Sequence, residues 1–193
     1  MAGLLDSDGS YSGTESYRYV ERLIREGGDL DIVSPYISLT YAKMLARHAR
    51  RHRVRLITSR SRPNKAALEY LNGALNPHRG WAKAALFTAL LSAAAFALGY
   101  WEALALLGAL TAALAAAAAL MRGRRHGNLM VKLSGGTFVH EKIYLSEGRA
   151  ITGSANLTYS GLHRNLEHVE LTTGKDRLGK LAGHFGALWG SLP

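Results

Sequence analysis

The sequence predicts an α/β fold, a mixed sheet flanked by helices, into which a two-helix hairpin is inserted. Short apolar runs typical of strands alternate with amphipathic segments typical of helices on both sides of residues 81–122. Between Lys83 and Arg122 the only charged residue is Glu102, so the composition changes abruptly there. We therefore expect residues 1–80 and 123–193 to form the two parts of one domain, with residues 81–122 as the insertion.

The first part of this domain is expected to begin with a helix over residues 14–26. Its apolar residues recur at helical spacing, Thr14 is a candidate N-cap, and Gly27-Gly28 ends the segment. The elements expected after it are a strand at 30–33 that ends at Ser34-Pro35, a basic amphipathic helix at 39–52, a buried strand at 54–58 and a helix at 64–75.

The second part is expected to contain more strand than helix. A Gly135-Gly136 turn between two apolar runs predicts a β-hairpin of residues 129–133 and 137–145. The elements expected after it are a strand at 150–153, a strand at 167–172 and a C-terminal helix at 176–192.

The inserted segment has the length and composition of two membrane spans. Residues 84–101 are 18 uncharged residues and residues 103–121 are 19, close to the roughly 20 that a helix needs to cross the hydrocarbon core. Lys83 precedes them and Arg122 follows, together with Arg124 and Arg125, as expected for flanks on the cytoplasmic side. Because alanine-rich helices are only weakly hydrophobic, a helical hairpin in a soluble protein remains the alternative. Residues 1–13 have neither the basic nor the apolar region of a signal peptide.

The overall composition excludes several kinds of scaffold and site. The 193 residues include no cysteine, which excludes disulfide scaffolds, thiol catalysis and cysteine-based metal sites. The formal net charge of +10 favours phosphate-bearing partners, either nucleic acid or anionic lipid. Basic proteins are common, so charge alone does not decide between them.

Five polar residues of the second part are candidates for a site. In a strand at 137–145, His140 and Lys142 would lie on one face about 7 Å apart, near enough to contact one phosphate. Ser154 and Asn156 follow a strand and precede a helical segment, where backbone N–H groups also bind anions. Glu167 opens the next strand. Taken singly, each has a structural explanation: a packed histidine, a surface lysine, or a helix N-cap.

In combination these residues resemble the signature of the phospholipase D superfamily, His-x-Lys followed by an acidic residue and then Gly-Ser-x-Asn. Residues 29–36, a strand ending in Ser-Pro-Tyr, extend the resemblance. The acidic position is occupied by Glu147, where the family usually has Asp, and is taken as structural. The matching segments are His140-Glu141-Lys142, Glu147, Gly153-Ser154-Ala155-Asn156-Leu157-Thr158 and Asn165-Leu166-Glu167.

The resemblance implies a mechanism that needs neither metal nor cofactor. His140 would attack phosphorus, and a second histidine would protonate the leaving oxygen. Because the chain has one such motif, a homodimer would supply the second His140. Lys142, Ser154 and Asn156 would bind the phosphate oxygens, and Glu167 would accept the other ring N–H of His140. His163 and His168 are expected to be surface residues.

We therefore expect a phosphodiesterase of the phospholipase D type, anchored in the cell membrane by the hairpin with its catalytic domain in the cytoplasm. A phospholipid is the favoured substrate. One alternative is a metal-independent endonuclease. The backbone of its nucleic-acid substrate would lie along four basic residues, Arg47, Arg50, Arg51 and Arg53. Another is an inactive membrane scaffold that keeps the fold.

Overall fold

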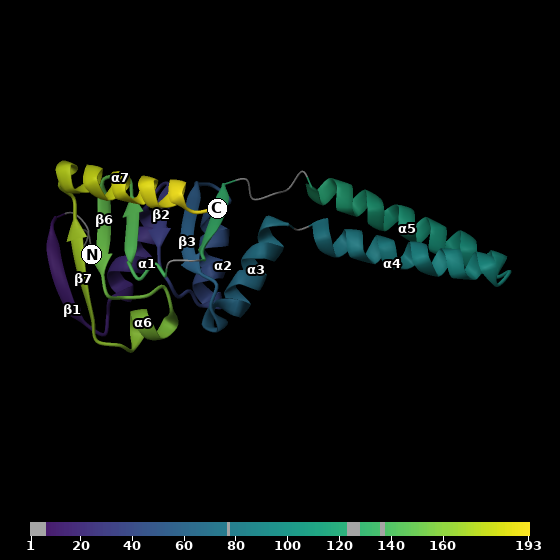
Figure 1. Ribbon diagram of the computed structural model, residues 1–193, viewed down its shortest axis with the longest axis horizontal. Helices are drawn as coiled ribbons and strands as arrows, with labels where there is room; N and C mark the ends of the chain where they lie inside the picture. Colours follow the sequence, from purple (N-terminus) through teal and green to yellow (C-terminus); the bar gives the residue numbers. More distant parts are fainter. Residues whose placement is uncertain (1–6, 77, 123–127, 136–137) are drawn as a thin grey trace. The chain divides into compact units, whose positions relative to one another are not determined.

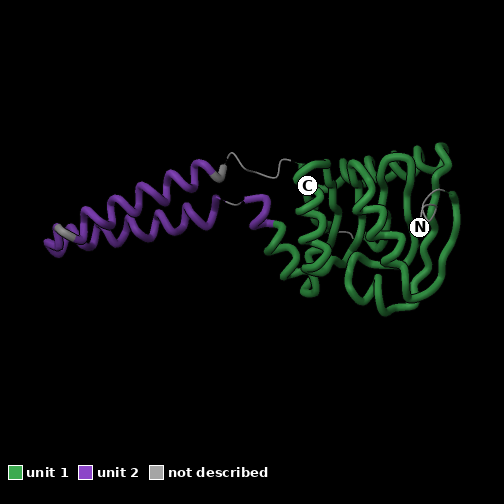
Figure 2. Tube along the Cα trace, turned by 180° about the vertical axis from the view of Figure 1, so that it is seen from behind, with its two compact units in different colours: residues 1–71, 127–193 green, residues 72–126 purple. Residues whose placement is uncertain are grey.

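The computed structural model describes residues 7–76, 78–122, 128–135 and 138–193. The chain divides into two compact units, one of Met1–Leu71 with Gly127–Pro193 and the other of Asn72–His126 (Figure 2). The first unit contains the sheet and the second contains two long helices. We describe each by itself.

The first unit is built on a seven-stranded mixed sheet, which confirms the expected α/β class (Figure 1). The strand order is β1-β7-β6-β5-β2-β3-β4, with β2–β3 and β3–β4 parallel and the other neighbours antiparallel. The strands are β1 (Gly9–Gly13), β2 (Leu30–Val33), β3 (Val54–Ser59), β4 (Leu129–Ser134), β5 (Ile143–Ser146), β6 (Arg149–Gly153) and β7 (Glu167–Thr172).

Helices cover both faces of the sheet (Figure 1). On one face, Phe185 of α7 (Lys175–Ser191) packs in an apolar cluster with Val33, Ile57 and Ile143. Side chains alternate along a strand, so Tyr144 points to the other face, where α1 (Tyr17–Glu26) and α2 (Leu39–His48) lie. The unit also contains the 3₁₀ turn η1 (Arg62–Asn64), most of α3 (Lys65–Leu75) and α6 (Tyr159–His163).

Two expectations about the strands are wrong. Residues 129–133 and 137–145 do not form a β-hairpin, because β4 pairs with β3 while β5 pairs with β2 and β6. Residues 138–142 are not strand, and residue 137 lies outside the described residues. The edge strand β1, which pairs with β7, falls in a Ser- and Gly-rich segment for which no strand was expected.

The helix boundaries differ from the expected ones by a few residues. The first helix begins at Tyr17 and its N-cap position is Ser16 instead of Thr14. Ser16 is buried, and its hydroxyl is 3.3 Å from the backbone oxygens of Gly161 and Leu162. The second helix ends at His48, four residues early. The contacts of Ser16 with the α6 region thus accompany the later start of α1.

The second unit is an antiparallel pair of helices, α4 (His78–Ala97) and α5 (Trp101–Arg122). Gly99 has a φ of 78°, the left-handed conformation that favours glycine in a tight turn. The hydroxyls of Thr88 and Thr111 are hydrogen-bonded across the pair at 2.9 Å. Both helices are long and apolar enough to cross a membrane, with a mean hydropathy of 1.4 for His78–Ala97 and 2.2 for Ala103–Leu120.

Candidate active site

The His-x-Lys segment lies immediately before β5, in the chain that leads into the strand. His140 and Lys142 therefore do not share the face of a strand, but their side chains meet. Lys142 Nζ is 2.7 Å from the backbone oxygen of His140 and 3.0 Å from its Nε2. An irregular backbone thus brings the imidazole and the ammonium together more closely than an extended strand would.

The two partners differ in their exposure to solvent. Lys142 is 5% exposed, and this burial lowers the pKa of its ammonium. The carboxylate of Glu167 acts in the opposite direction and raises the Lys142 pKa. His140 is exposed. The site therefore presents an accessible imidazole over a partly desolvated positive charge.

The loop after β6 brings Ser154 to Glu167. Gly153 has a φ of 152°, and a Cβ at this position would overlap His168 and approach the Cα of Val169 to 2.9 Å. Only glycine fits this turn. The Ser154 hydroxyl donates to Glu167 Oε2 and accepts from the N–H of His168 at 3.0 Å.

Glu167 is positioned by Ser154 and Asn165, whereas the expected partner was His140. Asn165 Nδ2 donates to Glu167 Oε1 at 3.1 Å, and Ser154 donates to the second oxygen. Among the hydrogen bonds of the described residues, none joins Glu167 to His140. The expected carboxylate–imidazole contact is therefore absent among the described residues, and the carboxylate is held instead by Ser154 and Asn165.

Asn156 is the second candidate site residue in this loop. Its side-chain oxygen is buried and has no hydrogen-bond partner within the described residues. The N-cap of α6 is Thr158, whose hydroxyl accepts from the N–H of Gly161 at 3.0 Å. Neither Ser154 nor Asn156 caps the helix, so this structural explanation for the two residues is wrong.

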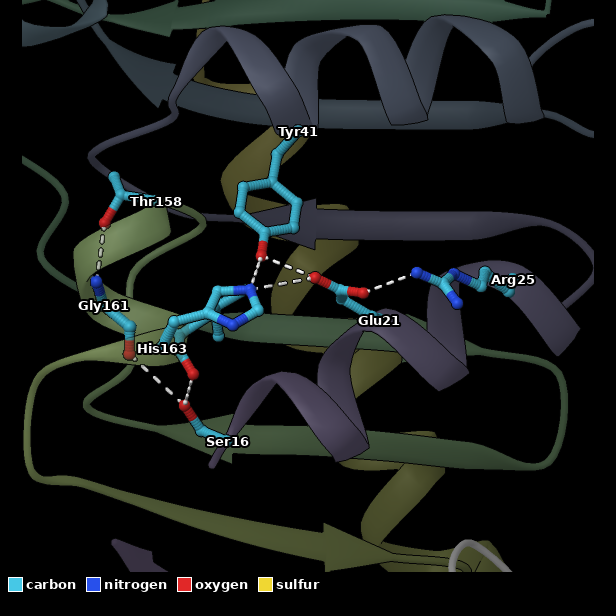
Figure 3. Close-up of polar contacts among 8 residues, drawn as sticks. Ser16, Glu21, Arg25, Tyr41, Thr158, Gly161 and His163 are labelled. Atoms are coloured by element: carbon cyan, nitrogen blue, oxygen red, sulfur yellow. Dashed lines mark hydrogen bonds and ion pairs between the residues drawn. The ribbon is translucent and has the colours of Figure 1, made fainter. Parts of the chain in front are cut away.

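The helix that follows this loop is fixed by a polar network beneath it (Figure 3). His163 Nε2 is 2.9 Å from the hydroxyl of Tyr41 and 3.2 Å from a carboxylate oxygen of Glu21. Its ring stacks between Tyr17 and Tyr159, with centroids 4.4 Å and 4.6 Å away. The expectation that His163 is a surface residue is thus wrong, because it ties α6 to α1 and α2. His168 is exposed, as expected.

The turn after β2 also supports the loop between β6 and α6. The N–H of Leu157 donates to Ser34 Oγ at 2.9 Å, and Ile37 and Leu157 form a parallel bridge. This turn depends on Asn64, which is fully buried and donates to the oxygens of Pro35 and Ser59 at 2.8 and 2.7 Å. The sequence did not single out Asn64, because nothing local distinguishes a helix-starting asparagine from one that bridges two loops.

Glu147 lies away from these groups. It occupies the turn between β5 and β6, at the opposite end of β5 from Lys142, and its carboxylate lies beside Gly28. The residues that the structure does bring together are His140 with Lys142, and Ser154 with Asn165 and Glu167. Imidazole, ammonium, hydroxyl and amide groups at one end of a sheet can bind and attack a phosphate.

Comparison with solved structures supports the fold. NucT from Helicobacter pylori matches with a TM-score of 0.59 at 13% identity, over 96% of this chain and 97% of that one. A phospholipase D family member, Nuc from Salmonella typhimurium, matches with a TM-score of 0.58 at 12% identity, over 97% of both chains. The archaeal chromatin protein TrmBL2 matches with a TM-score of 0.53 at 8% identity, over all of this chain and 55% of that one.

Sequence comparison identifies the family. A search of curated proteins found no match. The model of the family described as cardiolipin synthase, PLD-like domain, matches residues 20–189, which include strands β2 to β7 and every motif residue discussed above. The chain therefore belongs to this family of the phospholipase D superfamily.

Proposed function

We propose that the protein is a membrane-anchored phosphodiesterase that works through a phosphohistidine intermediate in a homodimeric active site. The observation that carries the proposal is the exposed imidazole of His140 beside the buried ammonium of Lys142, with Nε2 and Nζ 3.0 Å apart. A nucleophile next to a fixed positive charge suits attack on an anionic phosphodiester.

The reaction takes place in two displacements. A neutral His140 ring nitrogen forms a bond to phosphorus while the bond to the leaving oxygen breaks, and the protonated His140 of the second copy gives that oxygen a proton. The second imidazole, now neutral, takes a proton from water as the water oxygen attacks phosphorus and His140 leaves. Across the cycle the first imidazole carries the phosphoryl group, while the second gives up one proton and takes one back.

The phosphate oxygens gain charge as the reaction proceeds, and the proposal assigns their stabilisation to three side chains. Lys142 supplies the positive charge. Asn156 would donate through its amide nitrogen, and Ser154 would do so after exchanging its bond with Glu167. Removing one such donor from an enzyme costs about 3 kcal/mol of transition-state stabilisation. Glu167 and Asn165 keep Ser154 in place.

Exposed apolar residues beside the motif support the dimer. Leu166, between Asn165 and Glu167, is 84% exposed, and Phe138, two residues before His140, is 52% exposed. Burial of such side chains against a second copy is favourable. A twofold axis beside them would bring the same residues of two copies together, so each chain would contribute one His140 to a shared site.

The hairpin supports a membrane anchor. Large apolar side chains of α4 and α5, such as Phe87, Leu90 and Leu106, are exposed. The two candidate spans are only 11% and 6% buried, which argues against a core helix of a soluble protein. With the family's cardiolipin synthase description, this favours a phospholipid substrate held at high effective concentration by the anchor.

A nucleic acid is the second candidate substrate, and one topological observation favours it. The chain returns from the hairpin at Asn128, whose oxygen accepts from the N–H of Val54 at 2.6 Å, at the start of β3. The site lies at the other end of the sheet, where Ile143 pairs with Val33 at the end of β2. A strand of six residues separates these two ends of the sheet by about 20 Å, so the point where the chain re-enters this unit does not adjoin the site, which favours a soluble polymer as the substrate.

The test compares two substrates with one variant. The full chain in neutral detergent is given either phosphatidylglycerol or a fluorescent single-stranded oligonucleotide, with a chelator present. We expect turnover of the lipid, lost by at least about a thousandfold in His140→Gln and retained in His168→Gln, which changes an exposed imidazole. Phosphohistidine trapped on wild type alone would identify the nucleophile. Turnover in His140→Gln equal to wild type would refute the mechanism, and cleavage of only the oligonucleotide would refute the lipid substrate.

A further inference from the structure

A second cluster of basic residues lies in a groove outside the candidate active site. The groove has a volume of about 590 Å³ and lies between α1 and the end of α2. Among the described residues that line it, Ile24 and Met44 are the only apolar ones and none carries a carboxylate. The remaining lining residues are all basic: Arg25, Arg47, His48, Arg50, Arg51 and His52.

Most of this charge is not neutralised by the protein. Arg25 pairs with Glu21 at 2.6 Å, but Arg47, Arg50 and Arg51 form no ion pair within the described residues. The C-terminus of α2 offers about half a negative charge through its macrodipole, which is less than one arginine requires. The three arginines therefore retain a positive field that only an added anion would balance.

The groove lies at the end of the sheet where the chain returns from the hairpin. His52 is two residues before Val54, the first residue of β3. The N–H of Val54 donates to the oxygen of Asn128, which is the first described residue after α5. His140 and Lys142 lie at the opposite end, beside the end of β2. The groove is thus a feature separate from the active site.

We propose that this groove binds the phosphate of an anionic phospholipid headgroup, an inference that rests on the proposed insertion of the hairpin in a membrane. A concave cleft with several guanidinium groups suits one phosphate, because arginine donates to its oxygens in pairs. Lipid headgroups are the phosphates nearest to the root of a membrane hairpin. Among the described residues that line the groove there is no Phe, Tyr or Trp, which favours contacts with a single phosphate over stacking with nucleic-acid bases.

The test uses the full chain in micelles of a neutral detergent, which require no insertion into a bilayer. Native mass spectrometry measures how much phosphatidylglycerol or phosphatidylcholine each protein retains. The variant R47Q/R50Q/R51Q removes the three unpaired arginines. The variant K65Q/K175Q/K180Q removes the same charge from exposed positions elsewhere and serves as its control.

We expect wild type to prefer phosphatidylglycerol and R47Q/R50Q/R51Q to weaken its retention at least fivefold, with the control unchanged. Equal losses in both variants, or no preference in wild type, would overturn the proposal. It would also be overturned if an oligonucleotide, and not the lipid, shielded these arginines from phenylglyoxal. Carbonate extraction from vesicles tests the anchor separately, and His140→Gln tests the catalysis.

Discussion

At the scale of the residue, Lys142 combines its proposed chemical role with a cost to stability. Its ammonium is buried beside His140, and that burial lowers its pKa. Burial of a charge is unfavourable unless nearby groups compensate it, and here the compensation comes from Glu167 and the backbone oxygen of His140. Residues that bind the transition state commonly reduce stability in this way.

We therefore expect Lys142→Met to abolish turnover while raising the melting temperature at pH 7. Between the lowered pKa of Lys142 in the folded chain and its ordinary value of 10.5, the unfolded chain binds more protons, so the unfolding free energy of wild type rises with pH. The variant lacks this contribution, and its advantage should shrink as pH rises through that window. Thermal unfolding from pH 7 to 10 measures this, and a lower melting temperature for Lys142→Met at pH 7 would contradict it.

Gly153 shows the opposite case, a residue required by the backbone alone. Its φ of 152° and the lack of space for a Cβ lead us to expect that Gly153→Ala lowers the unfolding free energy by about 2 kcal/mol or more. The variant should also displace Ser154 and slow turnover. Urea unfolding gives the energy. Gly179→Ala, in α7 with open space around the new methyl group, should instead be neutral or stabilising.

At the scale of the element, the hairpin can be tested by one charge on its exposed surface. Leu106 in α5 is 76% exposed. In water, lysine at such a position is neutral or improves solubility, whereas in the hydrocarbon core it costs about 3 kcal/mol. We expect Leu106→Lys to reduce the fraction that resists carbonate extraction, and Leu98→Lys, near the turn, to have little effect because a lysine there reaches the interface. Equal extraction of wild type and Leu106→Lys would show that this surface does not face lipid.

The sequence predicts individual elements well where the pattern is local. The strands at 30–33 and 167–172 lie at their expected bounds, because short apolar runs between turn residues are read within a few positions. The pairing of β4 with β3 could not be predicted. Gly135-Gly136 suggests a local hairpin, but β2 and β3 lie between β4 and β5 in the sheet. Such pairing depends on contacts distant in sequence.

The candidate site shows the same difference between local patterns, which the sequence reveals, and contacts between distant residues, which it does not. Residue types and spacing select His140, Lys142, Ser154, Asn156 and Glu167 as candidates, and their chemical roles stay predictions. Their mutual contacts were not predictable: Glu167 binds Ser154 and Asn165 instead of His140. The residues that hold the loops, Asn64 and His163, were missed as site supports because their partners lie on other elements.

At the scale of the whole molecule, the proposed mechanism requires two copies. Within the described residues no other histidine contacts His140, so a single chain supplies one imidazole where the chemistry needs two. A shared site predicts a specific result for mixed dimers. Each mixed dimer of wild type and His140→Gln would contain one imidazole at its only site and would be inactive.

Random pairing of equal amounts of the two chains gives about one quarter wild-type dimers, one half mixed dimers and one quarter variant dimers. We expect the activity of co-expressed, differently tagged chains to fall to about a quarter of that of the same total amount of wild type. Independent sites in each chain would instead retain about half, since every wild-type copy would remain active. Mixed dimers isolated through both tags separate the two cases directly: full loss in that fraction supports a shared site, and half of the wild-type activity excludes it.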